Sequence, residues 1–123
     1  MKITTFNPMI VSKDAEPIIK LFEELGFERR HKKDDIDGRD ITSVRMTDAN
    51  GFHVDVAQAE SLPRDLTTMR MNVDDFEEAY AFLKAHGFVN AQGDHTVESA
   101  SSKSCLMWSP SGFSIQLTQH IKH

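Results

Sequence analysis

Asp48-Ala49-Asn50-Gly51-Phe52-His53-Val54-Asp55-Val56 is the stretch that decides the fold. Its first half contains residues typical of a tight turn, and its second half alternates polar with apolar residues. This combination predicts a hairpin turn that leads into a β-strand. The pattern recurs in altered form as Ser109-Pro110-Ser111-Gly112-Phe113-Ser114-Ile115-Gln116-Leu117, 61 residues further along the chain.

The offset of 61 residues also relates other landmarks. It joins Gly26-Phe27 to Gly87-Phe88 and Asp14 to Asp75. Several landmarks at one spacing indicate an internal duplication. We therefore expect a single domain over residues 1–123, with module one in 1–60, a linker in 59–66 and module two in 67–123.

Both modules are predicted to contain a strand, a helix and three further strands. In module one the strands are expected at 3–11, 27–32, 41–47 and 52–58, and a loop at 34–40. The helix is expected to begin with Asp14 as N-cap and Pro17 in its first turn, and to end at Gly26. In module two the strands are expected at 67–73, 89–92, 103–108 and 113–119, with a polar loop at 93–102. There Asp75 is the predicted N-cap, and Gly87 ends the helix.

Composition and charge exclude several classes of function. The net charge is −5 and the longest basic run, residues 29–33, is followed at once by two aspartates, so nucleic acid is not an expected partner. The run is read as a solvated edge strand, with an anion site as the alternative. No apolar segment reaches the roughly 18 residues of a membrane span, and Met1–Thr5 lacks a signal-peptide core. The single cysteine, Cys105, fits a reducing, cytoplasmic setting.

The period of two assigns strand residues to faces. Apolar rows are expected to pack under the helices, and they comprise Phe52, Val54, Val56, Phe113, Ile115 and Leu117, joined by Val44, Met46, Cys105 and Met107. Trp108 is also assigned to the helix side. The opposite, more polar faces carry Asn7, Met9, Val11, His53 and Asp55 in module one, and Thr68, Arg70, Asn72, Ser114 and Gln116 in module two. Two such faces opposite each other would enclose a cavity.

The chain resembles the vicinal-oxygen-chelate superfamily, which includes glyoxalases, bleomycin resistance proteins and extradiol dioxygenases. The resemblance rests on Val11-Ser12-Lys13-Asp14, Leu25-Gly26-Phe27 and the stretch from Asp48 to Asp55, repeated at Val73-Asp74-Asp75, His86-Gly87-Phe88 and Ser109–Gly112. It implies an α+β fold in which two tandem βαβββ modules form a U-shaped, mostly antiparallel sheet around a cavity, with the helices outside. It also implies a homodimer, in which modules pair within a chain or are swapped between chains.

The resemblance further implies a divalent metal, held by residues of the first and last strands of each module. The corresponding positions here are Asn7, Asp55, Thr68 and Gln116. Only Asp55 is a strong ligand, because metal sites of this kind favour imidazole and carboxylate groups. We therefore expect no metal and no other cofactor. If a metal does bind, Asp55, Gln116 and His53 are the expected ligands.

Several residues allow two interpretations. Asp55 and His53 could form an acid–base pair, or Asp55 could be neutralised by Arg70, and Arg70 could instead hold an anionic ligand. Cys105 is expected to be buried and inert rather than a catalytic thiol. Methionines 9, 46 and 107 could line an adaptable pocket, although core filling is favoured. The candidate cavity residues are Asn7, Met9, Met46, His53, Asp55, Thr68, Arg70, Cys105, Met107 and Gln116.

These observations favour a protein of the glyoxalase and bleomycin-resistance type that binds a small molecule without the usual metal. The alternative is a metal-dependent lyase, isomerase or dioxygenase with an altered ligand set. A third hypothesis is a degenerate module that serves protein interaction, which would expose an apolar patch.

Overall fold

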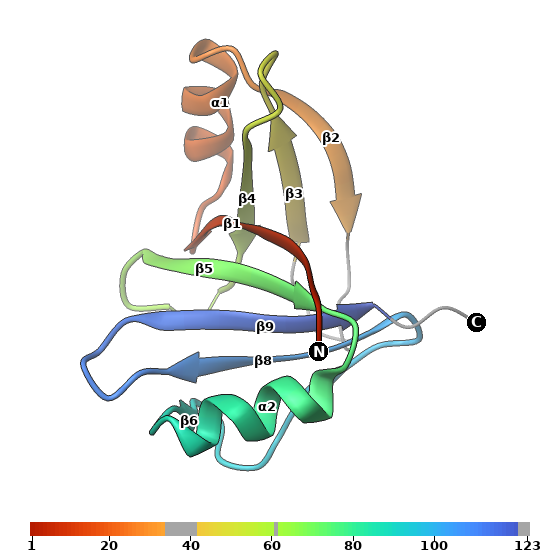
Figure 1. Ribbon diagram of the computed structural model, residues 1–123. Helices are drawn as coiled ribbons and strands as arrows, with labels where there is room; N and C mark the ends of the chain where they lie inside the picture. The colour runs from red at the N-terminus through yellow and green to blue at the C-terminus, as the bar shows by residue number, and fades with distance from the viewer. Residues whose placement is uncertain (34–41, 61, 121–123) are drawn as a thin grey trace. The chain divides into compact units, whose positions relative to one another are not determined.

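A computed structural model describes residues 1–33, 42–60 and 62–120 of the chain (Figure 1). This part has the predicted mixed α+β composition. Its elements, in chain order, are β1 (Ile3–Ser12), α1 (Glu16–Glu24), β2 (Glu28–Lys33), β3 (Thr42–Thr47), β4 (His53–Gln58), β5 (Leu66–Val73), α2 (Phe76–Ala85), β6 (Val89–Asn90), β7 (Val97–Glu98), β8 (Ser102–Trp108) and β9 (Ser114–His120). The predicted polar loop at 93–102 thus contains the short strand β7. The predicted loop at 34–40 lies outside the described residues.

The chain divides into two compact units. The first unit is Asn7–Thr67, and the second unit combines Met1–Phe6 with Thr68–His123, so that β1 contributes to both. The strand order is β2-β3-β4-β1 in the first unit and β5-β9-β8-β6 in the second, where β7 also pairs with β8. The predicted closure of the sheets around a cavity concerns the mutual position of the units and remains a prediction.

The two hairpin turns are built alike, as the duplication requires. The Asp48 carboxylate accepts hydrogen bonds from the backbone N–H groups of Asn50 and Phe52, at 3.0 and 2.8 Å. The Ser109 hydroxyl, at the equivalent position, accepts from the N–H groups of Gly112 and Phe113, both at 3.0 Å. Gly51 and Gly112 have φ of +83° and +107°, a region that favours glycine. The repeated turn predicted from the sequence is therefore confirmed in both units.

The two helices begin differently, and one predicted cap is wrong. Asp75 caps α2 as predicted, since its carboxylate accepts from the Glu78 N–H at 3.1 Å. The N-cap of α1 is Ala15 rather than Asp14, and it makes no side-chain capping bond. Long-range contacts replace it: the Gln58 side chain accepts from the Ala15 N–H at 3.1 Å, just as Gln119 accepts from the Phe76 N–H at 2.7 Å. Both glutamines occupy the same repeat position in the last strand of their unit.

Each helix packs on one face of its own sheet. The core of the first unit comprises Ala15, Ile19, Val44, Met46, Val54 and Val56. The core of the second unit comprises Met71, Val73, Phe76, Ala79, Leu83, Cys105, Met107, Ile115 and Leu117. The predicted apolar rows are thus largely confirmed. Phe52 and Phe113 are exceptions, because they precede β4 and β9 at the turns and remain 65% and 49% exposed.

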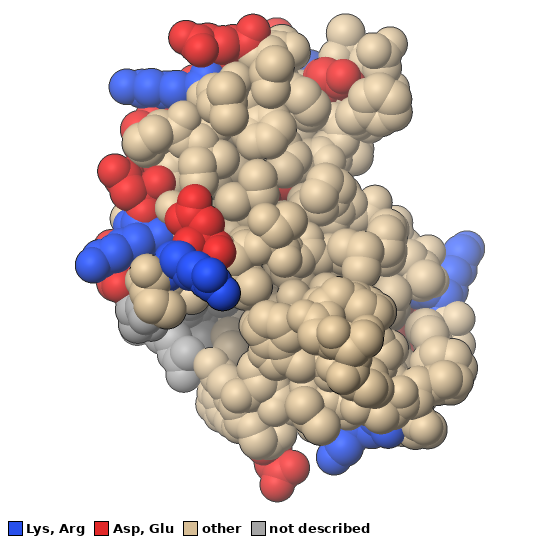
Figure 2. Space-filling model, turned by 90° about the vertical axis from the view of Figure 1, so that its left-hand side faces the viewer, with Lys and Arg blue, Asp and Glu red and all other residues tan. Residues whose placement is uncertain are grey.

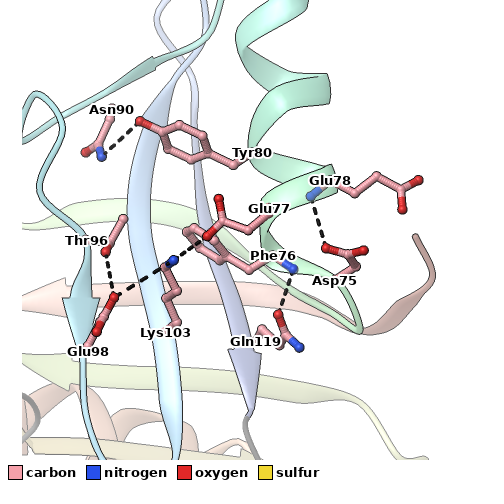
Figure 3. A network of polar contacts seen from close by, with 10 residues as sticks. All are labelled: Asp75, Phe76, Glu77, Glu78, Tyr80, Asn90, Thr96, Glu98, Lys103 and Gln119. Atoms are coloured by element: carbon pink, nitrogen blue, oxygen red, sulfur yellow. Dashed lines mark hydrogen bonds and ion pairs between the residues drawn. The ribbon is translucent and has the colours of Figure 1, made fainter.

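Polar contacts fasten α2 to its sheet (Figure 3). Lys103 of β8 forms an ion pair with Glu77 and lies 3.9 Å from Glu98 of β7. The Lys103 ammonium also lies 5.0 Å from the centre of the Phe76 ring. The hydrogen bond to Glu77 raises the pKa of Lys103 above its ordinary value. One lysine therefore links the helix, the sheet and the short strand β7.

The charged groups of the surface are mixed in sign. On the face of the described residues that Figure 2 shows, Lys and Arg side chains lie mostly beside Asp and Glu, and no broad basic patch forms. Neither helix in the described part of the chain has the length and apolar character needed to cross a bilayer.

Candidate functional site

The first unit carries its polar side chains on the sheet face opposite α1. Met9 of β1 stands in register with Asp55 of β4, and Asp55 stands opposite Arg45 of β3. The alternation of strand residues then adds Asn7 and His53 to this face. We call it the first polar face. Arg45 belongs to it although it was not among the predicted site residues.

Asp55 is the centre of the first polar face. Its residue is only 2% exposed, and its carboxylate accepts from Arg45 Nε at 3.0 Å and from Arg45 Nη2 at 3.3 Å. Asn7 Nδ2 donates a third hydrogen bond at 3.1 Å. A buried carboxylate needs such compensation, because removing its charge from water is otherwise very unfavourable. Register counting across the Asp48–Gly51 turn would have identified Arg45 from the sequence.

His53 is exposed beside this cluster. Its Nδ1 lies 2.8 Å from the hydroxyl of Thr47, its partner in the β3–β4 register. The Asp55 carboxylate, in contrast, is directed at Arg45 and Asn7. Because both oxygens of Asp55 already accept hydrogen bonds from Arg45, the geometry favours a positioning interaction over the predicted acid–base pair. The predicted pairing of Asp55 with Arg70 joins two units and remains a prediction.

The second unit has an equivalent face opposite α2, which we call the second polar face. Strand register arranges β5, β9 and β8 in rows across it. One row contains Arg70, Gln116 and Leu106, and the next contains Asn72, Thr118 and Ser104. Ser114 donates to the Thr68 hydroxyl at 2.8 Å and stands opposite Trp108. The predicted placement of Trp108 on the helix side is therefore wrong, because β8 turns Cys105 and Met107 to the helix and Trp108 away from it.

Two polar atoms of the second polar face lack protein partners. Asn72 Oδ1 and Thr118 Oγ1 find no hydrogen-bond partner within residues 1–33, 42–60 and 62–120, although the two residues are 3% and 4% exposed. They are neighbours in the β5–β9 register. Buried polar groups are almost always paired, so an unpaired couple on one face marks a strained or functional position.

Three predicted cavity residues belong to the helix-side cores instead. Met46 is fully buried against the α1 cluster, and Cys105 and Met107 lie in the α2 cluster. The register explains this correction, since Met46 stands opposite Val54 while Cys105 and Met107 stand opposite Leu117 and Ile115. The core-filling interpretation thus describes these two methionines, whereas Met9 stays on the first polar face.

Cys105 is expected to react slowly with thiol reagents. Burial raises the pKa of its thiol from 9.0 to about 12, so the folded protein keeps the thiol protonated and unreactive. The unfolded chain ionises above pH 9.0 while the folded chain does not, so the thiol's contribution to stability is complete below pH 9.0 and falls between pH 9.0 and about 12. Thiol labelling at neutral pH and urea unfolding against pH would test this, with Cys105→Ala as the control that lacks only the contribution of the thiol. Labelling of the native protein as fast as a free thiol would contradict it.

Thr118→Val is expected to stabilise the protein. The change removes a buried, unpaired hydroxyl and keeps the side-chain shape, so the free energy of unfolding should rise by about 1 kcal/mol. Thr68→Val is the matched control, because it breaks the bond to Ser114 and should lower the same quantity by about 1 kcal/mol. Urea unfolding would measure both. A loss in Thr118→Val equal to that in Thr68→Val would mean that the Thr118 hydroxyl has a bonding partner in solution.

The four positions implied as metal ligands do not form a suitable donor set in either unit. Asp55 is bonded to a guanidinium, whose charge would repel a cation, and the Thr68 hydroxyl is bonded to Ser114. Among the described residues, no group of three or more His, Cys, Asp or Glu side chains converges to hold a metal. The oxygens of Asp55 and Thr68 are thus already engaged by other side chains of their own units.

Comparisons with known proteins agree on the fold. A family model described as the Glyoxalase/Bleomycin resistance protein/Dioxygenase superfamily matches residues 5–117. A hypothetical protein from Bacillus halodurans C-125 is 11% identical, with a TM-score of 0.72 and coverage of 100% of this chain and 98% of that one. Methylmalonyl-CoA epimerase from Mycobacterium tuberculosis is 13% identical, with a TM-score of 0.69 and coverages of 95% and 88%.

Glyoxalase I from Zea mays is 16% identical, with a TM-score of 0.68. The match covers 98% of this chain but only 44% of the maize protein. A search of curated protein sequences finds no match. Identities this low establish a shared fold and leave the activity open.

Proposed function

The chain belongs to the Glyoxalase/Bleomycin resistance protein/Dioxygenase superfamily, and we propose that within it this protein binds a small organic molecule on its polar sheet faces without a divalent metal. The observation that supports the proposal is the bidentate ion pair between Arg45 and Asp55. It occupies both oxygens of the best metal ligand with a cation. Arg45 itself is 29% exposed and keeps N–H donors of the kind that orient ligands.

The composition of the two faces supports an organic ligand. Polar side chains stand beside Met9 in the first unit, and beside Leu106 and Trp108 in the second. Small-molecule sites combine apolar area with a few well-placed polar groups in this way. Trp108 is the only tryptophan of the chain, so its fluorescence would report binding at the second polar face directly.

The metal question has a direct test. Protein purified without chelator should contain no stoichiometric divalent ion by mass spectrometry, and zinc, nickel, manganese or iron should not bind on titration. If an ion is found and is lost in Asp55→Asn but kept in Asp94→Asn, an exposed control, the alternative of a metal-dependent lyase, isomerase or dioxygenase replaces this proposal. A panel of metabolites screened by Trp108 fluorescence in the presence of chelator would then identify ligands for the metal-free protein.

The proposal includes a cytoplasmic homodimer. Members of the superfamily commonly pair their modules in dimers, as the resemblance implies, and a lone, buried cysteine needs no oxidising compartment. Light scattering coupled to size-exclusion chromatography would test the dimer, and a mass near 13.9 kDa, that of one chain, would contradict it.

A further inference from the structure

The Arg45 guanidinium has N–H donors beyond those that bind Asp55. Its Nε and Nη2 face the Asp55 carboxylate, and within the described residues Asp55 is the only acceptor of its hydrogen bonds. The Arg45 side chain is 29% exposed, whereas that of Asp55 is 3% exposed. A guanidinium has five N–H donors in a planar fork, so one edge remains for another acceptor.

The surroundings of Arg45 hold this edge in place. Asp55 binds the guanidinium at two points, and Asn7 in turn binds Asp55. A long, flexible side chain fixed by a buried partner loses less entropy when it binds a ligand. His53 lies diagonally across the β3–β4 hairpin from Arg45, is exposed, and keeps Nε2 available because its Nδ1 contacts Thr47.

A register shift in β2 changes which residue of that strand pairs with Arg45 of β3. Arg29 pairs with Met46, but the register then shifts by one residue, so that His31 pairs with Arg45 and Lys33 with Ser43. Arg29 consequently lies on the α1 side, where it forms ion pairs with Glu16 and Glu23. Without the shift, Arg30 would take the register position opposite Arg45. Bulges that redirect residues in this way are frequent beside functional sites.

We propose that the first polar face binds the oxyanion group, carboxylate or phosphate, of the small-molecule ligand, with Arg45 as the anion-binding residue and Asp55 as the residue that positions it. This rests on the proposed function and specifies the ligand as anionic. Carboxylate and phosphate both present the paired oxygens that a guanidinium fork matches. Arg45 keeps N–H donors beyond those that face Asp55, and the exposed His53 lies diagonally across the hairpin from it.

The test is an NMR titration of the isotope-labelled protein with sodium phosphate and, separately, with sodium acetate, in the presence of chelator. Sodium chloride at equal ionic strength separates binding from screening. We expect at least one of the two anions to shift the Arg45 Nε–H and His53 amide signals saturably. A response to phosphate alone would identify a phosphorylated ligand class, and a response to acetate a carboxylate class.

Variants make the test specific. Arg45→Lys keeps the charge but loses the fork and should weaken binding about tenfold. Arg45→Gln combined with Asp55→Asn removes both charges together, so that a folded protein remains, and should abolish binding. Arg29→Gln, on the other side of the same sheet, should leave binding unchanged.

Two results would overturn the inference: neither anion shifts the Arg45 signal, or the double variant binds as tightly as the unchanged protein. These results are distinguishable from a failure of the proposed function. A metal detected by mass spectrometry would refute metal-free binding and leave the anion titration valid. Trp108 fluorescence would still report ligands if Arg45 bound no anion.

Discussion

Arg45→Met is expected to lower the free energy of unfolding by about 3 kcal/mol. The change removes the bidentate partner of a carboxylate whose residue is 2% exposed, so a buried charge loses two hydrogen bonds from a cation. Urea unfolding followed by circular dichroism would measure the effect.

Two further variants test whether the Arg45–Asp55 pair contributes more to the free energy of unfolding than an exposed ion pair does. The double change of Arg45→Met with Asp55→Leu should recover much of the loss, because no buried charge then remains. Arg29→Met should change stability little, since its ion pair with Glu16 is exposed on both sides. If Arg45→Met were as mild as Arg29→Met, Asp55 would be compensated mainly by other groups, and the role assigned to Arg45 would be wrong.

Phe76→Ala is expected to lower the free energy of unfolding by about 4 kcal/mol. Phe76 begins α2, is 2% exposed, and stacks on Tyr80 with the ring centres 5.8 Å apart. Its removal leaves a cavity in the core of the second unit and takes away the ring beneath Lys103. Urea unfolding would again provide the measurement, with retention of the far-ultraviolet spectrum as evidence of folding.

Phe82→Ala is the matched control, on the same helix but with 52% of the residue exposed. Truncation there should change stability by no more than about 0.5 kcal/mol, because surface substitutions leave no cavity. Equal losses in the two variants would mean that Phe82 is buried in solution. That result would point to an interface over α2, and it would revive the hypothesis of a protein-interaction module.

Local patterns predicted most of the elements correctly. The turn at Asp48–Gly51 and its repeat at Ser109–Gly112 depend on side chains that bond to backbone groups at most four residues away. The Asp75 cap acts over three residues. Such short-range interactions involve residues close together in the sequence, so they can be predicted from the sequence alone. The predicted cap of α1 was wrong because the side chain that accepts from the Ala15 N–H belongs to Gln58, 43 residues further along the chain.

The candidate site was predicted in part for the same reason. Alternation along single strands placed Asn7, Met9 and Asp55 on one face, and the register of β1 and β4 agrees. Arg45 was missed, and Met46 was counted both in the apolar row and among the cavity candidates, because the residue that faces another across a hairpin depends on strand pairing. Similarly, Trp108 was assigned to the helix side although β8 directs Met107 there.

The sequence by itself predicted the order of most strands and helices, because these depend on periodicity and on turn chemistry within a few residues. Its resemblance to the superfamily is confirmed by the family model that matches residues 5–117. Only the tertiary structure decided which buried polar side chains become hydrogen-bond or ion-pair partners. The compensation of Asp55 by Arg45 and Asn7, and the unpaired atoms of Asn72 and Thr118, are properties of neighbouring strands brought into register. Burial makes those pairings strong, because a polar group removed from water must find its partner in the protein or remain unsatisfied.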